Sequence, residues 1–142
     1  MTDLSNPQLL PYLLNRLVGQ MNKTWLTTLR QHGITVQRWQ VLSVLSERRG
    51  LRVSDLADMT SLDQPVLTRV VDQMVRDGLA ARHANPDDSR SKLVLISDEG
   101  FSVFIALLPQ AQGLLDTMYG DVPEPDKQQI MTLLTKLMSN LE

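Results

Sequence analysis

The sequence predicts a mainly α-helical chain with one small β-hairpin, and three observations support this fold class. Apolar residues recur at helical spacing through most of the 142 residues. The period shortens to about two residues on either side of a polar run at 85–92. Residues that start and stop helices separate the periodic segments. Six helices and two short strands are therefore expected.

The first helix is expected to begin near Pro7 or Pro11, because proline fits the first turn, and to end at Gly33. Its apolar face is wider than one neighbouring element can cover, which is typical of a helix buried on several sides, as in a dimer core. That face comprises Leu9, Leu10, Leu13, Leu14, Leu17, Val18, Met21, Trp25 and Leu29.

Three shorter helices are expected next, at about 35–48, 53–60 and 63–78. Thr35 is the expected N-cap of the first of them, and Pro65 fits the first turn of the last. Gly78 is expected to stop that last helix.

Two strands are expected after Gly78, at 79–84 and 93–96, and the polar, turn-forming residues 85–92 between them predict a hairpin tip. Ser97 is the expected N-cap of a fifth helix that runs to about Met118.

Pro109 is expected to kink the fifth helix. A turn at 120–125 then leads to a sixth helix with one apolar stripe. The stripe comprises Ile130, Leu133, Leu134, Leu137, Met138 and Leu141.

The helices at 53–60 and 63–78 have the spacing of a helix-turn-helix. Ala57 supplies the small side chain that two steeply crossing helices need where they approach. Ser61 stands at the tight turn, where many such motifs have glycine. The residues expected to fill the space between the helices are Leu56, Leu62, Leu67 and Val70. Because a strand and a hairpin follow directly, the order of elements is that of a winged helix.

The polar face of helix 63–78 predicts contact with DNA in the major groove. Arginine suits guanine, glutamine suits adenine, and threonine can bond either base or touch a thymine methyl group. The predicted contacts on this helix are Gln64, Thr68, Arg69 and Gln73. The alternative is that this is a solvated helix face without a partner.

The hairpin tip predicts a second contact. Arg90 is a long cation on a thin hairpin and can enter a narrow minor groove. Asp88 could pair with Arg90 and fix its direction, and Ser91 and Lys92 could contact phosphates. The alternative is that Arg90 and Asp88 form only an exposed surface pair, which would contribute under ~1 kcal/mol.

Four stretches, taken in order, resemble the MarR family of transcriptional regulators over essentially the whole chain. They are residues 34–42, residues 77–82, Asp88-Ser89-Arg90 in the wing, and residues 95–100. Ser89 departs from the family pattern, in which an arginine is common there, and the acidic Asp72 and Asp87 limit the basic character of the site.

The resemblance implies a triangular homodimer whose first, fifth and sixth helices form the interface. Its winged domains would sit on adjacent turns of DNA, and a small aromatic or phenolic ligand would relieve repression. The expected division is a dimerisation helix at 1–33, the DNA-binding domain at 34–97 and further dimerisation helices at 98–142.

Trp25 and Trp39 are candidates for lining a ligand pocket between the dimerisation helices and the DNA-binding unit. On apolar helical stripes, however, tryptophan more often belongs to the core.

Composition narrows the function classes. The net charge is −2, yet residues 38–92 carry nine Lys/Arg against eight Asp/Glu, so the acidity lies elsewhere, mainly after residue 92. The absence of cysteine excludes disulfides and thiolate zinc sites, and it fits a reducing cytoplasm. No apolar run has the ~20 residues of a membrane span, and the N-terminus shows no secretory signal.

Neither a catalytic set nor a metal site is visible in the sequence. Its two histidines, His32 and His83, are interpreted as structural, and no cofactor is expected. The sequence therefore predicts a cytoplasmic, homodimeric regulator, a repressor rather than an enzyme, that reads a pseudo-palindromic operator in double-stranded DNA. The alternative is a winged-helix protein-interaction module that does not bind DNA, which the many aspartates of residues 55–88 would favour.

Overall fold

The structure, a computed structural model, describes residues 5–142. The four residues before them, on which the expectation of no secretory signal depends, lie outside the described part. Over residues 5–142 the chain forms six helices and one two-stranded antiparallel sheet, which confirms the predicted fold class. The elements are α1 (Leu9–Gln31), α2 (Val36–Ser46), α3 (Val53–Thr60), α4 (Gln64–Arg76), β1 (Ala80–Ala84), β2 (Lys92–Ile96), α5 (Asp98–Tyr119) and α6 (Glu124–Ser139).

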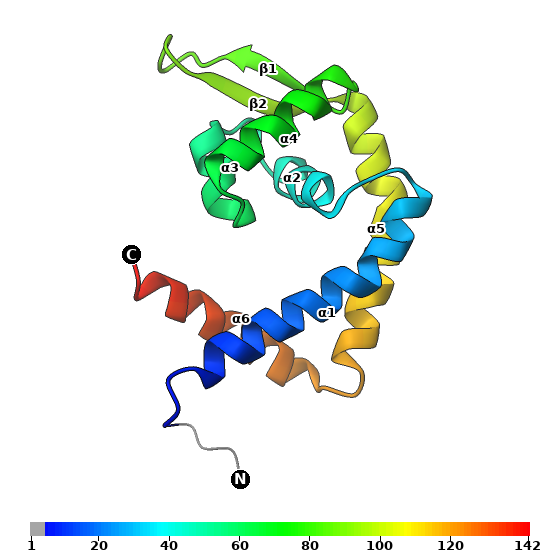
Figure 1. The fold of residues 1–142 in the computed structure, drawn as a ribbon, viewed down its shortest axis with the longest axis vertical. Coiled ribbons are helices and arrows are strands. Elements are labelled where there is room, and N and C mark those ends of the chain that lie inside the picture. The colour runs from blue at the N-terminus through cyan, green and yellow to red at the C-terminus, as the bar shows by residue number, and fades with distance from the viewer. Residues whose placement is uncertain (1–4) are drawn as a thin grey trace.

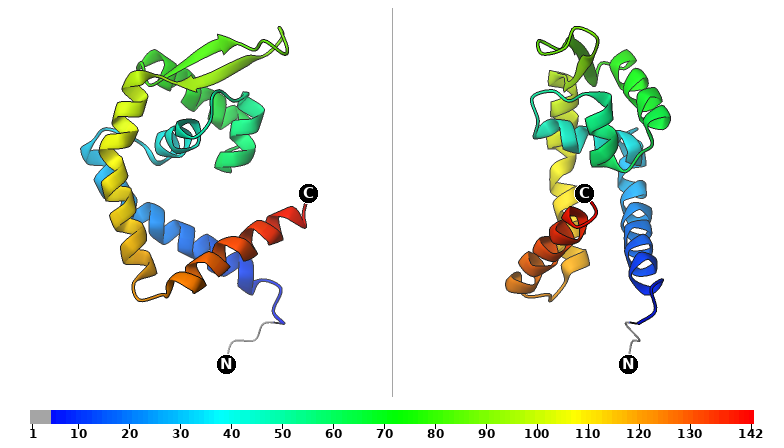
Figure 2. Two further views of the ribbon diagram at one scale, coloured as in Figure 1. Left: turned by 180° about the vertical axis from the view of Figure 1, so that it is seen from behind. Right: turned by 90° about the vertical axis from the view of Figure 1, so that its left-hand side faces the viewer.

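The elements separate into two parts (Figure 1). Helices α2, α3 and α4 and the hairpin gather at one end of the molecule. The N-terminal part of α1, the end of α5 and all of α6 form the other end, and α5 runs between the two (Figure 2).

The predicted helix boundaries rest on hydrogen bonds that the structure shows. The Thr35 hydroxyl accepts from the backbone N–H of Arg38 at 3.1 Å, and the Ser97 hydroxyl accepts from that of Gly100 at 3.0 Å. Gly33 and Gly78 follow α1 and α4 with φ of +68° and +79°. Both glycines therefore occupy the left-handed conformation that ends many helices.

Two helix boundaries and the course of α5 differ in detail from the expectation. Helix α2 ends at Ser46 rather than near Arg48. Pro125, expected in a turn, lies in the first turn of α6, where its missing N–H costs no helical hydrogen bond. Helix α5 runs through Pro109, the position of the expected kink, and remains one helix to Tyr119.

The hydrophobic core lies in the winged part. Helix α2 is at its centre, and α3, α4 and β2 pack around it, together with the C-terminal half of α1 and the middle of α5. The side chains with 0–1% exposure are Leu29, Val41, Leu42, Leu45, Leu56, Leu67, Val71, Met74, Val94 and Leu107. Burying a leucine of this kind stabilises a fold by about 1.5–3 kcal/mol.

The hairpin is fixed at its base and projects at its tip. Strands β1 and β2 pair in the register Ala80↔Ile96 through Ala84↔Lys92. Leu51 and Val94 exchange backbone hydrogen bonds of 3.1 and 2.8 Å, which fasten β2 to the segment between α2 and α3. The tip therefore extends from a rigid base.

The start of α5 packs closely against the start of the hairpin. A Cβ atom on Gly100 would overlap the carbonyl oxygen of Leu79, so no larger residue fits without a backbone shift. The Ser97 hydroxyl also donates to the carbonyl oxygen of Gly78 at 2.5 Å. These contacts set the direction in which α5 leaves the winged part.

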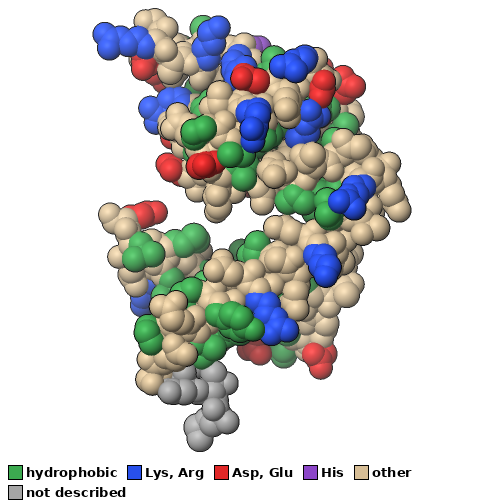
Figure 3. Space-filling model, viewed as in Figure 1, with side chains coloured by type: hydrophobic (Ala, Val, Ile, Leu, Met, Phe, Trp, Pro, Cys, Tyr) green, Lys and Arg blue, Asp and Glu red, His purple; other side chains and the backbone are tan. Residues whose placement is uncertain are grey.

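The helical end carries its apolar residues on the surface. Helix α6 buries none of its sixteen residues, and Ile130, Leu133 and Leu137 are 42–50% exposed. The first half of α1 is similar, with Leu10 and Leu13 both 49% exposed. Figure 3 shows apolar side chains gathered on this end of the molecule.

Candidate nucleic-acid interface

The sequence-predicted contacts of α4 lie on one exposed face. Leu67, Val70, Val71 and Met74 point into the core, and the opposite side of the helix is open to solvent. That open side carries Gln64, Thr68, Arg69 and Gln73. The same 3.6-residue period that buries one face of a helix exposes the other.

The turn before α4 is tight, and a serine makes it. Ser61 ends α3 with φ 58° and ψ 15°, and it is the one non-glycine residue with positive φ in the described part of the chain. A side chain in this left-handed conformation costs roughly 1–2 kcal/mol. The helix-turn-helix therefore forms without the glycine that many such turns contain.

At the hairpin tip, the structure corrects one detail of the expected pairing. Asp88 Oδ1 accepts from the backbone N–H of Arg90 at 2.9 Å, and the side chains of these two residues do not form an ion pair. Asp88 therefore shapes the turn, as aspartate does when it bonds the backbone two residues on. The guanidinium group of Arg90 remains exposed at the tip.

Two more side chains stiffen the tip. Asn85 Oδ1 accepts from the backbone N–H of Asp87 at 3.0 Å, and Asn85 Nδ2 donates to the Ser91 hydroxyl at 3.0 Å. Ser91 is half-buried, whereas Lys92 is exposed. Of these two predicted phosphate contacts, Lys92 is the more accessible.

A polar hollow lies between the wing, the start of α3 and the start of α4. Its lining includes the cations Arg52, Arg82 and Lys92, together with Gln64 and Ser91. The start of α3 adds the partial positive charge of a helix N-terminus. This combination suits a phosphate group. Figure 3 shows several Lys and Arg side chains on this part of the molecule.

Two of these cations also have acidic partners. Arg52 Nε and Nη2 donate to the two carboxylate oxygens of Asp55 at 3.0 and 3.1 Å, which raises the pKa of Arg52 and lowers that of Asp55. Arg82 Nη2 donates to Asp72 Oδ1 at 2.5 Å. The hollow collects residues from three separate segments, so no local pattern in the sequence indicates it.

Helix α4 is tied to α2 by a further ion pair. Arg38 Nη2 donates to Asp77 Oδ2 at 2.6 Å, and the Arg38 side chain is only 16% exposed. The pair joins the first turn of α2 to the residue that caps the end of α4. The two residues are 39 positions apart, so no local pattern in the sequence could have indicated the contact.

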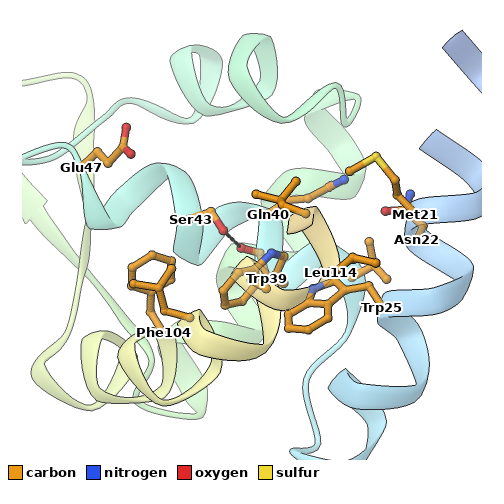
Figure 4. A pocket seen from close by; sticks show the side chains of 13 residues that line it. Met21, Asn22, Trp25, Trp39, Gln40, Ser43, Glu47, Phe104 and Leu114 are labelled. Atoms are coloured by element: carbon orange, nitrogen blue, oxygen red, sulfur yellow. Dashed lines mark hydrogen bonds between the residues drawn. The ribbon is translucent and has the colours of Figure 1, made fainter. Parts of the chain in front are cut away.

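Behind the DNA-facing elements lies an apolar cavity of about 370 Å³, bounded by α1, α2 and α5 (Figure 4). The rings of Trp25 and Trp39 meet edge to face with centroids 5.2 Å apart, and Trp39 stacks on Phe104 at 5.3 Å. Trp25 is 5% exposed and belongs to the core, and both tryptophans also line this cavity. Their ligand-binding role stays a prediction. Phe104 was not foreseen, since its place beside Trp39 depends on how α5 crosses α2.

Two fully buried polar atoms, both in residues that line the cavity, lack a hydrogen-bond partner in the described structure. They are the indole nitrogen of Trp25 and the side-chain oxygen of Gln40. Buried polar groups in proteins are nearly always bonded, so such atoms commonly mark a place where a ligand or water binds.

Residues 5–142 contain neither a candidate membrane span nor a candidate metal site. No helix there is both long and apolar enough to span a membrane, and no three His, Cys, Asp or Glu side chains are grouped as metal ligands would be.

Comparison with known proteins shows which family the chain resembles. The family model described as "MarR family" matches residues 32–91. The transcriptional activatory protein BadR of Rhodopseudomonas palustris is 28% identical over 135 residues, which cover 92% of this chain and 77% of that protein. The homoprotocatechuate degradative operon repressor of Escherichia coli is 28% identical over 109 residues, which cover 77% and 71% of the two chains.

The fold agrees with these relatives. The crystal structure of a MarR-family transcriptional regulator from Silicibacter pomeroyi matches with a TM-score of 0.86 and 25% identity, covering 99% of this chain and 97% of that one. A helix-turn-helix with an open polar face, followed at once by a basic hairpin, defines a winged helix-turn-helix, DNA-binding transcriptional regulator. Within that class, the chain belongs to the MarR family.

Proposed function

We propose that this regulator binds a pseudo-palindromic operator as a homodimer, with the α4 of each protomer in the major groove and Arg90 in the flanking minor groove. One observation carries the proposal: the polar face of α4 and the tip of the wing are both exposed, and both belong to the same packed unit. In this proposal residues 34–97 read DNA, and residues 1–33 and 98–142 hold the dimer. The two half-sites would be about 10 base pairs apart, centre to centre.

The exposed apolar surface of the helical end supports the dimer. Several leucines of α1 and α6, such as Leu17 and Leu133, are 44–50% exposed. Removing their apolar surface from water would be favourable. An apolar surface of this kind marks an interface, and a second copy of the chain presents the matching surface.

We further propose that the cavity between α1, α2 and α5 binds a small aromatic effector that relieves repression in the cytoplasm. Three aromatic rings and two unpartnered polar atoms support a ligand of that class. The E. coli relative is named as the repressor of an operon that degrades homoprotocatechuate, an aromatic acid, and this name supports the aromatic character of the ligand but not its charge. Ligand binding would act on α2, which Arg38 connects to the end of α4.

The rival hypothesis of a protein-interaction module loses part of its support. It depended on the acidic residues of the winged part, and Asp55, Asp72 and Asp77 each pair with an arginine. Three of the seven aspartates at 55–88 are therefore compensated by arginines of the same chain.

Selection of DNA from a random duplex pool at fixed salt tests the proposal. Wild-type protein should enrich a two-fold symmetric site, because a symmetric dimer reads two equal half-sites. Arg69→Ala should relax base preference at one position per half-site and cost about 1–3 kcal/mol there. Arg90→Ala should weaken binding more evenly and in a way that depends on the A·T content of the flanks.

Arg30→Ala is the matched control, because it removes an exposed arginine of α1 far from the wing. The control should bind as wild type does. Enrichment without symmetry, or equal losses at Arg30 and Arg69, would contradict the proposed interface.

A further inference from the structure

The effector cavity, as we call the cavity between α1, α2 and α5, has an unbalanced charge. Among the described residues that line it, Glu47 is the one ionisable side chain, and no lysine, arginine or histidine joins it. Glu47 lies at the rim, toward the Phe104 side, whereas Trp25 and Gln40 lie farther in (Figure 4). In residues 5–142 no cation lies within 4 Å of the Glu47 carboxylate.

The backbone adds to this negative charge. Glu47 is the C-cap residue of α2, and the last turn of α2 contains no basic residue. The C-terminus of a helix carries a partial negative charge of about half an elementary unit. Arg48 and Arg49 follow Glu47 directly in the chain and offset part of this charge, but neither lines the cavity. The carboxylate and the helix end are therefore the negative groups at its mouth.

The aromatic walls also favour a positive group. The faces of tryptophan and phenylalanine rings are negative, and a cation over them gains about 0.5–2 kcal/mol. Trp39 is central here, since it contacts both Trp25 and Phe104.

A ligand with a carboxylate group would bind less favourably. It would lose its hydration in an apolar cavity whose lining offers no cation, and burying an unpaired charge is costly. The polar side chains of this lining could offer a carboxylate hydrogen bonds at most, and none of them is a cation.

We propose that the effector of this protein is an aromatic compound without negative charge, and that an aromatic amine, with its ammonium group toward Glu47, is preferred over a neutral analogue. The proposal rests on the proposed function of the effector cavity and specifies its ligand class.

Three probes with one ring system and three charges test this. Calorimetry on the full-length protein would compare 2-naphthylmethylamine, 2-naphthylmethanol and 2-naphthoate, so that any residue a partner protomer contributes is present. We expect the amine to bind about threefold more tightly than the alcohol, the usual size of one exposed ion pair. We expect the naphthoate to bind at least about tenfold more weakly than the alcohol.

The Glu47→Gln variant should remove the advantage of the amine and leave the affinity for the alcohol unchanged. Asp121→Asn, which removes an exposed carboxylate in the turn between α5 and α6, is the matched control and should keep the wild-type order. A parallel titration would measure how each probe releases operator DNA.

The outcomes separate the two proposals. If the naphthoate binds as tightly as the alcohol, or if Glu47→Gln leaves the advantage of the amine intact, the charge preference is wrong. Release of DNA by any probe would still support the effector cavity. If none of the three probes binds, both the ligand class and the effector function of the cavity are wrong.

Discussion

Helices α4 and α6 each carry an apolar stripe, yet the two stripes end in opposite environments. Helix α4 buries four of its thirteen residues, whereas α6 buries none of sixteen. The difference lies in the neighbours, because α4 packs on α2 and β1 and the apolar stripe of α6 has no cover within one chain. The comparison shows that the same pattern can be satisfied inside a chain or require a second one.

The border between buried and exposed apolar residues falls inside α1. Trp25 and Leu29, near its C-terminus, are 5% and 0% exposed and belong to the core. Leu10, Leu13 and Leu17, about two to five turns earlier, face solvent. A single helix therefore belongs to the winged core at one end and to the proposed dimer interface at the other.

The largest effect is expected from a substitution that disrupts the proposed dimer interface at the helical end. Leu137→Glu places a charge on the exposed apolar stripe of α6, and it does so twice in a dimer. Losing about 2 kcal/mol per protomer should weaken dimerisation about a thousandfold. Analytical ultracentrifugation would measure the dissociation constant, and helical circular dichroism would show that the winged part remains folded.

Thr132→Glu is the control for this experiment, because it adds the same charge on the opposite side of α6. The control should remain dimeric. A Leu137→Glu variant that dimerises as wild type does would mean that the stripe is covered in some other way.

A smaller effect is expected where α5 leaves the winged part. Gly100→Ala forces a methyl group into the carbonyl oxygen of Leu79, so the backbone must shift. We expect a loss of about 3 kcal/mol in the free energy of unfolding, the upper end of the usual cost of overpacking. Urea denaturation would measure it. Gly113→Ala, in the same helix with open space around it, should be neutral or up to about 1 kcal/mol more stable. Equal losses at the two glycines would contradict the close packing at Gly100.

The smallest effect concerns the turn between α3 and α4. Ser61→Gly should stabilise the protein by about 0.5–1 kcal/mol, because glycine adopts the left-handed conformation without strain but loses more entropy on folding. Ser61→Ala keeps the strain and should change little. A thermal unfolding series would detect the difference, and a glycine variant no more stable than the alanine variant would show that the turn is unstrained.

Much of the local structure could be predicted from the residues. Thr35 and Ser97 cap their helices as expected, and the inward face of α4 is the predicted one. These features depend on a few neighbouring residues, whose hydrogen bonding and spacing the sequence displays directly. The wing was placed correctly for the same reason, but the role of Asp88 was wrong in detail, since its carboxylate bonds a backbone N–H rather than the Arg90 side chain.

The sequence by itself therefore determined the helices, the hairpin, the open polar face of α4 and the family of the protein. Only the tertiary structure decided that Arg38 meets Asp77, that Arg52 and Arg82 share a hollow with Lys92, and that Phe104 joins the two tryptophans. Local features follow from spacing along the chain, where periodicity carries the information. Contacts between distant segments depend on the angles at which helices cross, and those angles are set by the packing of the whole core.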